Sequence, residues 1–464
     1  MKAYDVIVIG SGPGGMAAAE RAARYGKRVL VIERQWIGGT YTHMGAVPSK
    51  ALIDNARIAW LLKHQGEQFG FDFQNLSLKY ASAVRRSRSV SEDLSVILKN
   101  KMTDLGIDFF VGNAKVSAIN EISVIRKDGS QEYYKTDHIV IATGADPLHL
   151  PQFPIDGKQI ITYQQAVLQE RLPEHVLIVG GGALGVEFAT VWNNYGVQVT
   201  IVELESRLVS YEDEEIGPEL EKVFKERGMR ILTDSQVKAV QIIDDRINVK
   251  VETSQSIEEI NVDQVLEAIS FKHNSSGIGL ESLGVELGPN GMIVVDDHMQ
   301  TTVAGIWAVG DVNGRLMLAI SAAAQGEVCA ENICGFSRVL RDEDFENMQK
   351  VTYSQPQIGS FGMTEGLARE RGYSIKIGRA KFNENARAIC KGQTQGWVKV
   401  ITNAETDQIL GVHMIADQVD DLLPQLSFVK WMENTPQEFS RHLQAKPTLS
   451  ESLKLAAQDM VWEK

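Results

Sequence analysis

Two glycine-rich turns, each followed by an acidic residue, are the parts of this 464-residue chain whose residue types and spacing suit phosphate binding. In such turns the first glycine permits a tight bend, the second lets backbone amides approach a pyrophosphate, and the third lets a helix pack against a strand. The pyrophosphate then lies at the helix N-terminus, where free N–H groups favour an anion. The first turn contains Gly10, Gly12, Pro13 and Gly15 and precedes Glu33, and the second contains Gly180, Gly182 and Gly185 and precedes Glu203.

The elements that must position these turns repeat as well. An apolar segment leads into each turn, a helical segment leaves it, and a second apolar segment ends at the acid. The acid follows the first glycine by 23 positions in both copies. We therefore expect two βαβ units that each bind a dinucleotide. The expected elements are strand 4–9, helix 16–25 and strand 28–32 in the first unit, and strand 175–179, helix 186–195 and strand 198–202 in the second.

The acid in the second copy bears on cofactor choice. A carboxylate at the end of the second strand accepts hydrogen bonds from a ribose 2′-hydroxyl and repels a 2′-phosphate. Glu203 therefore favours NAD(H) over NADP(H). Arg207 lies close by in the sequence and would suit a 2′-phosphate, so NADPH stays open.

The composition narrows the class of protein. A chain of this length exceeds a single hydrophobic core, so we expect two to four domains. A net charge of −13 and a pI near 5.3 argue against a nucleic-acid partner, and the basic run 85–88 is interpreted as a solvated helix face. The apolar run 176–186 is too short for a membrane span. Three cysteines without metal-ligand spacing, and no secretory leader, favour a cytoplasmic protein.

Three further segments carry a resemblance to a known family. They read Gly-Gly-Thr-Tyr-Thr-His-Met-Gly-Ala-Val-Pro-Ser-Lys at 38–50, Ile-Val-Ile-Ala-Thr-Gly at 139–144, and Gly-Ile-Trp-Ala-Val-Gly-Asp at 305–311. Together with the glycine turns, they resemble the motifs of the pyridine nucleotide-disulfide oxidoreductases, and within that family the dihydrolipoamide dehydrogenase group. The resemblance covers essentially the whole chain.

The resemblance implies an α/β fold with two Rossmann-like dinucleotide-binding domains and a C-terminal α+β dimerisation domain. The implied FAD-binding domain comprises residues 1–149 and 276–345, with an NAD(P)-binding domain at 150–275 and an interface domain at 346–464. Family members are two-fold dimers in which the partner's C-terminal domain completes each active site, so a homodimer is expected.

The resemblance also assigns site residues. The implied FAD contacts are Gly10, Gly12, Pro13 and Gly15 at the pyrophosphate, Glu33 at the adenosine ribose, Gly39 and Thr40 near the phosphates, Ala114 near the adenine, Thr143, Gly144, Gly310 and Ala319 along the cofactor, and Asp311 at the ribityl chain. The implied nicotinamide-nucleotide residues are Gly180, Gly182, Gly185, Glu203 and Ser270. The implied catalytic pair is Lys50, beside the flavin, and Glu187 as its ion-pair partner, because a cation there would stabilise reduced, anionic flavin.

The chain departs from the family at the residues that perform disulfide chemistry. Tyr41 and Ala46 stand at the two cysteine positions, and Lys446 replaces the C-terminal histidine of the His-Pro-Thr motif. A thiolate is the nucleophile that disulfide exchange requires, so we expect no disulfide reduction. Lys446 is interpreted either as a structural ion-pair partner of Glu451 or as a substrate-binding cation. Ser270, where the family has glycine, is expected to weaken nicotinamide-nucleotide binding.

Two functions stay open on these residues. The first is an FAD-dependent NAD(P)H oxidoreductase that passes electrons from nicotinamide through flavin to a small-molecule acceptor other than a disulfide: a quinone, a dye, oxygen or another nicotinamide nucleotide. The second is a flavin-binding structural or regulatory homodimer with little turnover. Tyr41 is expected to fill space rather than to bind a ligand. His43 lies in a Thr-His-x-Gly stretch similar to that of the soluble pyridine nucleotide transhydrogenases, and is expected to be structural rather than catalytic.

Overall fold

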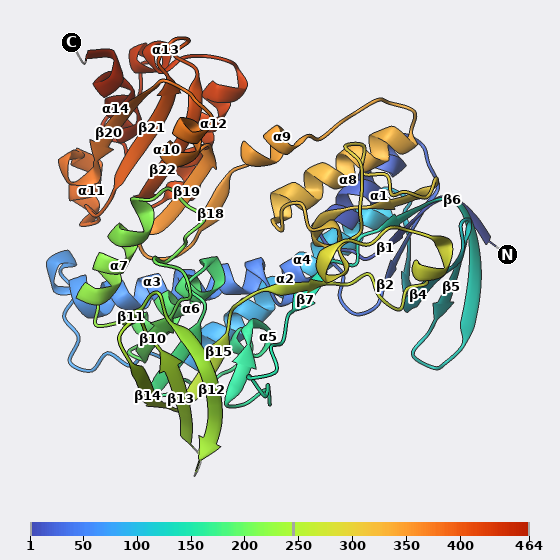
Figure 1. The fold of residues 1–464 in the computed structure, drawn as a ribbon, viewed down its shortest axis with the longest axis horizontal. Helices are drawn as coiled ribbons and strands as arrows, with labels where there is room; N and C mark the ends of the chain where they lie inside the picture. Colours follow the sequence, from blue (N-terminus) through green and yellow to red (C-terminus); the bar gives the residue numbers. More distant parts are fainter. Residues whose placement is uncertain (1, 244–245, 463–464) are drawn as a thin grey trace. The chain divides into compact units, whose positions relative to one another are not determined.

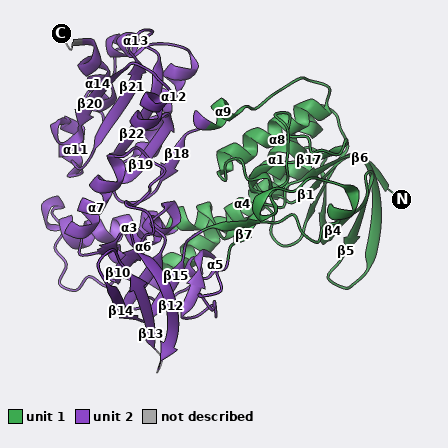
Figure 2. Ribbon diagram, viewed as in Figure 1, with its two compact units in different colours: residues 1–51, 82–148, 270–345 green, residues 52–81, 149–269, 346–464 purple. Residues whose placement is uncertain are grey.

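The computed structural model describes residues 2–243 and 246–462 and divides into two compact units (Figure 2). Unit 1 comprises residues 1–51, 82–148 and 270–345, and unit 2 comprises residues 52–81, 149–269 and 346–464. Both units are α/β, as expected. Across the described ranges, no helix combines the length and the apolar character that crossing a membrane requires.

Unit 1 is built on a seven-stranded sheet in the order β3-β2-β1-β6-β5-β4, with β17 paired to β6 (Figure 1). The strands β1, β2, β3, β6 and β17 run parallel, whereas β4 and β5 are antiparallel. A short two-stranded ribbon joins β7 and β16. The strands are β1 (Lys2–Ile9), β2 (Val29–Glu33), β3 (Asp108–Val111), β4 (Asn113–Ala118), β5 (Glu121–Ile125), β6 (Gln131–Ile141), β7 (Ala145–Pro147), β16 (Phe271–His273) and β17 (Ile306–Ala308).

The helices associated with unit 1 pack through glycine. A Cβ on Gly326 would lie 2.2 Å from the Gly14 carbonyl oxygen, so α1 and α8 can touch only because this position lacks a side chain. Apolar strand residues such as Ile7, Ile139 and Leu30 form the buried core. The helices are α1 (Pro13–Arg24), α2 (Gly39–His43), α4 (Tyr80–Asp104), α8 (Ala319–Ile333), α9 (Asp342–Glu346) and the 3₁₀ turn η4 (Gly310–Asn313).

Unit 2 contains a five-stranded parallel sheet, β11-β10-β9-β15-β8, and a three-stranded antiparallel sheet, β12-β13-β14. The central strands β9 and β10 of the parallel sheet are rich in β-branched residues and buried on both faces, as parallel strands usually are. The elements are β8 (Ile160–Thr162), α5 (Tyr163–Ala166), β9 (His175–Val179), α6 (Ala183–Asn194), β10 (Gln198–Val202), α7 (Ile216–Glu226), β11 (Arg230–Leu232), β12 (Gln236–Ile243), β13 (Arg246–Glu252), β14 (Ile257–Val262) and β15 (Gln264–Glu267).

The C-terminal part of unit 2 is an antiparallel sheet, β18-β19-β22-β21-β20, whose buried face packs against α12 and α14. Helix α3 (Ala46–Gln65) comes much earlier in the chain, and its residues from 52 onward also belong to unit 2. The elements are β18 (Lys350–Thr352), β19 (Gln357–Gly362), α10 (Glu365–Glu370), β20 (Ile375–Lys381), α11 (Ala386–Lys391), β21 (Trp397–Asn403), β22 (Ile409–Ala416), α12 (Val419–Trp431), α13 (Pro436–Arg441) and α14 (Glu451–Trp462).

The two expected βαβ units are present, with small shifts at their ends. Both helices begin three residues before the sequence-based expectation, at Pro13 and Ala183, because the second glycine of each turn is the N-cap. Proline suits the first helical position, since its missing N–H has no intrahelical partner there. The apolar periodicity from which the boundaries were predicted starts only one turn later.

Candidate functional site

The first glycine turn, in unit 1, is shaped by backbone contacts. A Cβ on Gly10 would lie 2.2 Å from the Ala142 carbonyl oxygen, and one on Gly15 would lie 2.0 Å from the Gly10 carbonyl oxygen. Neither position tolerates a side chain. By contrast, a Cβ added to Gly12 would have no protein atom within 4 Å. The turn is therefore closed toward the protein and open at Gly12, where a pyrophosphate would approach the start of α1.

Glu33 is joined to this turn by hydrogen bonds. Its Oε2 accepts from the Ser11 backbone N–H at 2.9 Å and from the Ser11 hydroxyl at 2.7 Å, and its Oε1 accepts from the Gln35 N–H at 2.9 Å. Ser11 Oγ also accepts from the Gly38 N–H at 3.1 Å. One buried serine thus connects the glycine turn, the acid at the end of β2 and the start of segment 38–50.

The second turn, in unit 2, repeats this geometry. A Cβ on Gly180 would lie 2.3 Å from the Ala268 carbonyl oxygen and one on Gly185 would lie 1.9 Å from the Gly180 carbonyl oxygen, whereas Gly182 faces open space. Glu203 Oε2 accepts from the Gly181 N–H and Oε1 from the Glu205 N–H. Each acid therefore contacts the middle of its own turn, and the sequence repeat is also a repeat of hydrogen bonds.

Asp311, on η4, is half-buried, and no described residue donates a hydrogen bond to its carboxylate. Burial raises the pKa of this carboxyl, and His273 partly opposes the rise. A desolvated acceptor without a protein donor fits a ligand that supplies hydroxyl groups, as the ribityl chain of FAD does. The glycine turn and Asp311 both lie in unit 1 and together fit the cofactor that the motifs imply.

Thr143 and Gly144, which follow β6, are held by Asn274. The Asn274 N–H donates to the Gly144 carbonyl oxygen at 3.0 Å, and the Thr143 hydroxyl donates to the Asn274 carbonyl oxygen at 2.7 Å. Among the other predicted contacts, Ala114 lies half-buried on β4, and Ala319 begins α8. Ser270 is exposed, and its carbonyl oxygen accepts from the Leu148 N–H.

Segment 38–50 starts against the glycine turn. A Cβ on Gly39 would lie 2.9 Å from the Gly12 Cα, so the N-terminus of α2, which includes Thr40, packs against the backbone of the turn at Gly12. Tyr41 is 38% exposed. Its ring therefore keeps an accessible face in unit 1.

His43 has structural contacts. It is 6% exposed, its ring stacks on Trp36, and its Nε2–H donates to the Ile37 carbonyl oxygen at 3.1 Å. Burial lowers the pKa of the imidazole, so the neutral form is favoured. The carbonyl oxygen of His43 accepts from Arg88 Nη1 at 2.9 Å. These contacts fix the end of α2.

Lys50 and Glu187 have different surroundings. Glu187, in α6 of unit 2, is 7% exposed, and its Oε1 accepts from the Tyr353 N–H at 2.9 Å. It is therefore not a solvated surface carboxylate. Lys50 is half-buried on α3. The two residues belong to different units, and their ion pair stays a prediction.

The thiols of unit 1 are poor nucleophiles. Cys329 is fully buried in α8, and burial raises the pKa of its thiol well above the ordinary value. Cys334, at the end of α8, also has a raised pKa because of burial. Cys390, in unit 2, is exposed. A thiol without access or thiolate character does not exchange with disulfides.

Lys446 forms the ion pair expected with Glu451. The distance from Lys446 Nζ to Glu451 Oε1 is 2.8 Å, and the lysine side chain is 77% exposed. Contact with Lys446 is the main reason that the pKa of Glu451 is lowered. Such an exposed pair contributes little to stability.

Sequence reasoning missed several residues that shape the site. Ser11 lies inside the glycine motif and was passed over as a spacer, although a hydroxyl between two glycines was a usable signal. Arg88 was interpreted as part of a solvated basic face, yet it contacts His43. Asn274 holds Thr143 and Gly144 through both its main chain and its side-chain amide, and Tyr353 contacts Glu187 through its main-chain N–H. Nothing in the sequence indicates which partners these groups meet.

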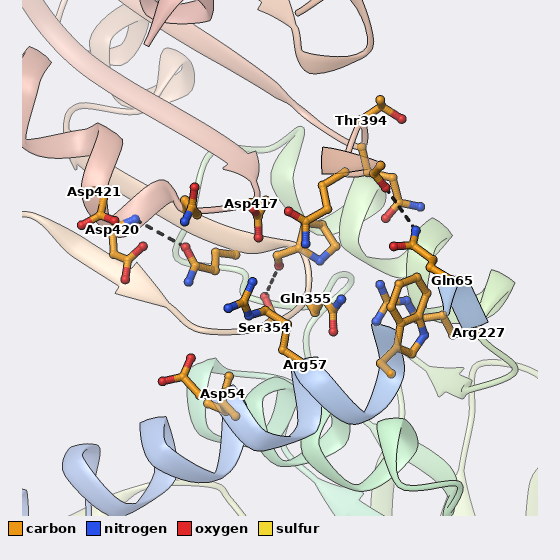
Figure 3. Close-up of a pocket in the computed structure, with 18 residues that line it drawn as sticks. Asp54, Arg57, Gln65, Arg227, Ser354, Gln355, Thr394, Asp417, Asp420 and Asp421 are labelled. Atoms are coloured by element: carbon orange, nitrogen blue, oxygen red, sulfur yellow. Dashed lines mark hydrogen bonds between the residues drawn. The ribbon is translucent and has the colours of Figure 1, made fainter. Parts of the chain in front are cut away.

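A cavity of about 450 Å³ in unit 2 is lined by none of the predicted cofactor residues (Figure 3). Asp54 and Arg57 reach it from α3, and Asp420 and Asp421 from the start of α12. Burial, followed by the neighbouring Asp421, raises the pKa of Asp420. Its surplus of carboxylates over guanidinium groups disfavours a phosphate ligand. Within the described residues, no group of histidine, cysteine or acidic side chains has the arrangement of a metal site.

The chain resembles known proteins along its whole length. Residues 4–326 match the pyridine nucleotide-disulphide oxidoreductase family, and residues 348–457 match its dimerisation domain. Dihydrolipoyl dehydrogenase of Mycobacterium leprae is 38% identical over 98% of this chain and 97% of its own length, and that of Bacillus subtilis is 33% identical with the same coverage.

Solved structures agree with this assignment. The crystal structure of LpdA from Mycobacterium tuberculosis superposes with a TM-score of 0.91 at 27% identity, covering 98% of this chain and 99% of that one. The copper complex of the flavoprotein disulfide reductase RclA from Escherichia coli shares the fold, with a TM-score of 0.88 at 24% identity over 99% of each chain. With FAD- and NAD-binding folds and a C-terminal dimerisation domain, the chain belongs to the pyridine nucleotide-disulphide oxidoreductase family of flavoprotein enzymes.

Proposed function

We propose that this chain is an FAD-dependent NAD(P)H oxidoreductase that passes electrons from a nicotinamide cofactor through flavin directly to a small-molecule acceptor other than a disulfide. The observation that carries the proposal is the pairing of two complete nucleotide cradles with a segment 38–50 that contains no sulfur nucleophile. Tyr41 and Ala46 occupy the family's cysteine positions, and the unit 1 thiols are disfavoured as thiolates. Quinones, dyes, oxygen and a second nicotinamide nucleotide are acceptors of the required kind.

Different residues of the chain would bind FAD and stabilise its reduced form. FAD, when bound, supplies the redox chemistry. Gly10, Gly12, Pro13 and Gly15 would hold its pyrophosphate, with Glu33 at the ribose and Asp311 at the sugar-alcohol chain. Lys50 would hold a positive charge beside the reduced cofactor, and Glu187 would keep that lysine in place.

Preference for NAD(H) over NADP(H) is part of the proposal. Glu203 lies at the second turn, and a further carboxylate, Glu205, is next but one in the chain. The Arg207 guanidinium donates to the carbonyl oxygens of Ser210 and Glu212. An arginine engaged by its own loop is less available to a 2′-phosphate, which supports the preference.

We also infer a homodimer, because residues 348–457 match the family's dimerisation domain. In this dimer Lys446, which is exposed and paired with Glu451, stands where the family has a proton-shuttling histidine. The replacement supports an acceptor that needs no thiol protonation by the protein.

The test is anaerobic reduction of the purified protein by NADH, followed by steady-state turnover with quinones and dyes. We expect the band of oxidised flavin, at about 450 nm, to bleach. Lys50→Ala and Glu187→Ala should lower turnover while FAD stays bound. Failure of both NADH and NADPH to bleach the flavin would favour a structural or regulatory flavoprotein. NADH-dependent reduction of lipoamide would contradict the choice of a non-disulfide acceptor.

A further inference from the structure

The turn that carries Asp311 is bounded by two glycines. Gly310 and Gly314 have φ angles of +79° and +68°, which L side chains rarely adopt. A turn with such hinges needs contacts from neighbouring elements to hold one position. The position matters, because the Asp311 carboxylate accepts no hydrogen bond from any described residue and would be available to the FAD of the proposed function.

Most of these contacts act on the ends of the turn. Gln325 Oε1, from α8, accepts from the Gly310 N–H at 2.7 Å and from Asn313 Nδ2 at 2.7 Å. The Val312 carbonyl oxygen accepts from the Ile293 N–H at 3.0 Å. None of these bonds involves Asp311 itself.

His273 contacts the turn at Asp311. Its Nδ1 lies 2.6 Å from the Asp311 carbonyl oxygen. A carbonyl oxygen can only accept, so Nδ1 carries the proton in this bond. The same oxygen also accepts from the Gly314 N–H, but at 3.2 Å. The imidazole therefore makes the shorter of the two bonds that orient the peptide after Asp311.

The surroundings of His273 leave it little freedom. The residue is 8% exposed and ends β16, where it pairs with Ala145 of β7. A Cβ on Gly314 would lie 3.2 Å from the ring, so the glycine provides the space that the imidazole fills. The next residue, Asn274, holds Thr143 and Gly144. Consecutive residues thus fasten two predicted parts of the FAD site.

We propose that His273 is a positioning residue of the FAD site, which holds the Asp311 carboxylate in place through the Nδ1–H bond to the Asp311 carbonyl oxygen. The proposal rests on the placement of Asp311 at FAD that forms part of the proposed function. It assigns His273 no contact with the reacting atoms. Its consequence is that FAD affinity depends on a donor at the Nδ1 position rather than on a ring.

The test compares FAD dissociation constants of purified variants, measured by reconstitution of apoprotein and the change in flavin fluorescence. His273→Asn keeps a donor near the position of Nδ1, whereas His273→Gln places its amide farther out and His273→Phe keeps only the ring. Loss of a bond to a buried acceptor predicts a dissociation constant about tenfold higher for the Phe and Gln variants. The Asn variant should stay within about threefold of the unsubstituted protein, since it retains the bond.

His298→Phe is the matched control. His298 Nδ1 lies 2.7 Å from the Arg338 carbonyl oxygen, which is a bond of the same kind in the same unit with an acceptor outside η4. It should leave FAD affinity unchanged. Equal weakening by His298→Phe and His273→Phe, or equal weakening by the Asn and Gln variants, would overturn the role of His273.

Asp311→Ala distinguishes a failure of the inference about His273 from a failure of the placement of Asp311 at FAD. If it weakens FAD binding while His273→Phe does not, the inference about His273 fails and the placement of Asp311 stands. If Asp311→Ala leaves FAD affinity unchanged, the placement of Asp311 fails and the inference fails with it. Urea unfolding of each apoprotein shows whether a loss of affinity reflects the site, because His298→Phe loses a bond of the same kind and a similar unfolding midpoint for His298→Phe and His273→Phe is expected.

Discussion

Replacing Gly182 by alanine should strongly weaken the use of NADH without disturbing the fold or FAD binding. Gly182 is the N-cap of α6 with φ −73° and ψ −174°, a conformation that alanine adopts freely. No protein atom lies within 4 Å of the added Cβ. Alanine is a poorer N-cap than glycine by some tenths of a kcal/mol, and it loses less chain entropy on folding, so the free energy of unfolding should change by less than about 1 kcal/mol.

The expected loss falls on the nucleotide. A methyl group at the open face keeps backbone amides from approaching the pyrophosphate, and a hydrogen bond to a charged group is worth about 1.5–3 kcal/mol. Loss of about 3 kcal/mol corresponds to about a 100-fold higher NADH concentration for half-maximal reduction. Anaerobic titration of the flavin band with NADH measures this concentration, and the absorbance of the gel-filtered protein measures FAD content.

Two variants serve as controls for Gly182→Ala. Gly12→Ala, in the equivalent open position of the first turn, should lose FAD instead. Gly185→Ala should impair folding, because its Cβ would lie 1.9 Å from the Gly180 carbonyl oxygen. An unchanged NADH requirement in Gly182→Ala would refute the assignment of this turn to the nicotinamide nucleotide.

Four further predictions concern other residues. Glu203→Ala should raise KM for NADH about tenfold, because the ribose of NADH loses a hydrogen-bond acceptor. KM for NADPH should change less, because its 2′-phosphate is no longer repelled by the carboxylate. An unchanged ratio of kcat/KM for the two cofactors would contradict this prediction. Lys399 is 1% exposed, and its Nζ lies 2.9 Å from Asp213 Oδ1. Lys399→Met should leave a buried carboxylate without its cation and lower the free energy of unfolding in urea by about 3–5 kcal/mol. A decrease below about 1 kcal/mol would refute the reasoning. Burial raises the pKa of Asp213, but the Glu365 N–H, His413 and Lys399 outweigh burial and lower the pKa below 3.8. The ionised Asp213 carboxylate therefore stabilises the fold above that pH, and this stabilisation is lost as the pH falls through the folded pKa. Asp213→Asn should flatten the decline of the free energy of unfolding at acid pH. His43→Phe should keep FAD and NADH-driven reduction, since the ring stacks on Trp36, and loss of turnover with FAD retained would show a catalytic role.

The sequence by itself determined the two glycine turns and the residues of segment 38–50, from which the missing dithiol relay is proposed. Glycine spacing acts through local sterics: Gly10 and Gly15 are required where a Cβ would overlap a neighbouring carbonyl oxygen, and such overlaps depend on residues close in the chain or on one adjacent strand. That Tyr41 and Ala46 stand in segment 38–50 is a matter of residue identity alone. The helix starts were predicted three residues late, since apolar periodicity begins after the cap.

Only the tertiary structure decided which polar groups meet. His273 and Asp311 are 38 positions apart, Arg88 and His43 are 45 apart, and Glu187 and the Tyr353 N–H are 166 apart. Main-chain donors and acceptors look alike at every position of a sequence. Which of them a buried side chain contacts depends on how strands and helices pack, and the roles of these residues therefore emerge only from the fold.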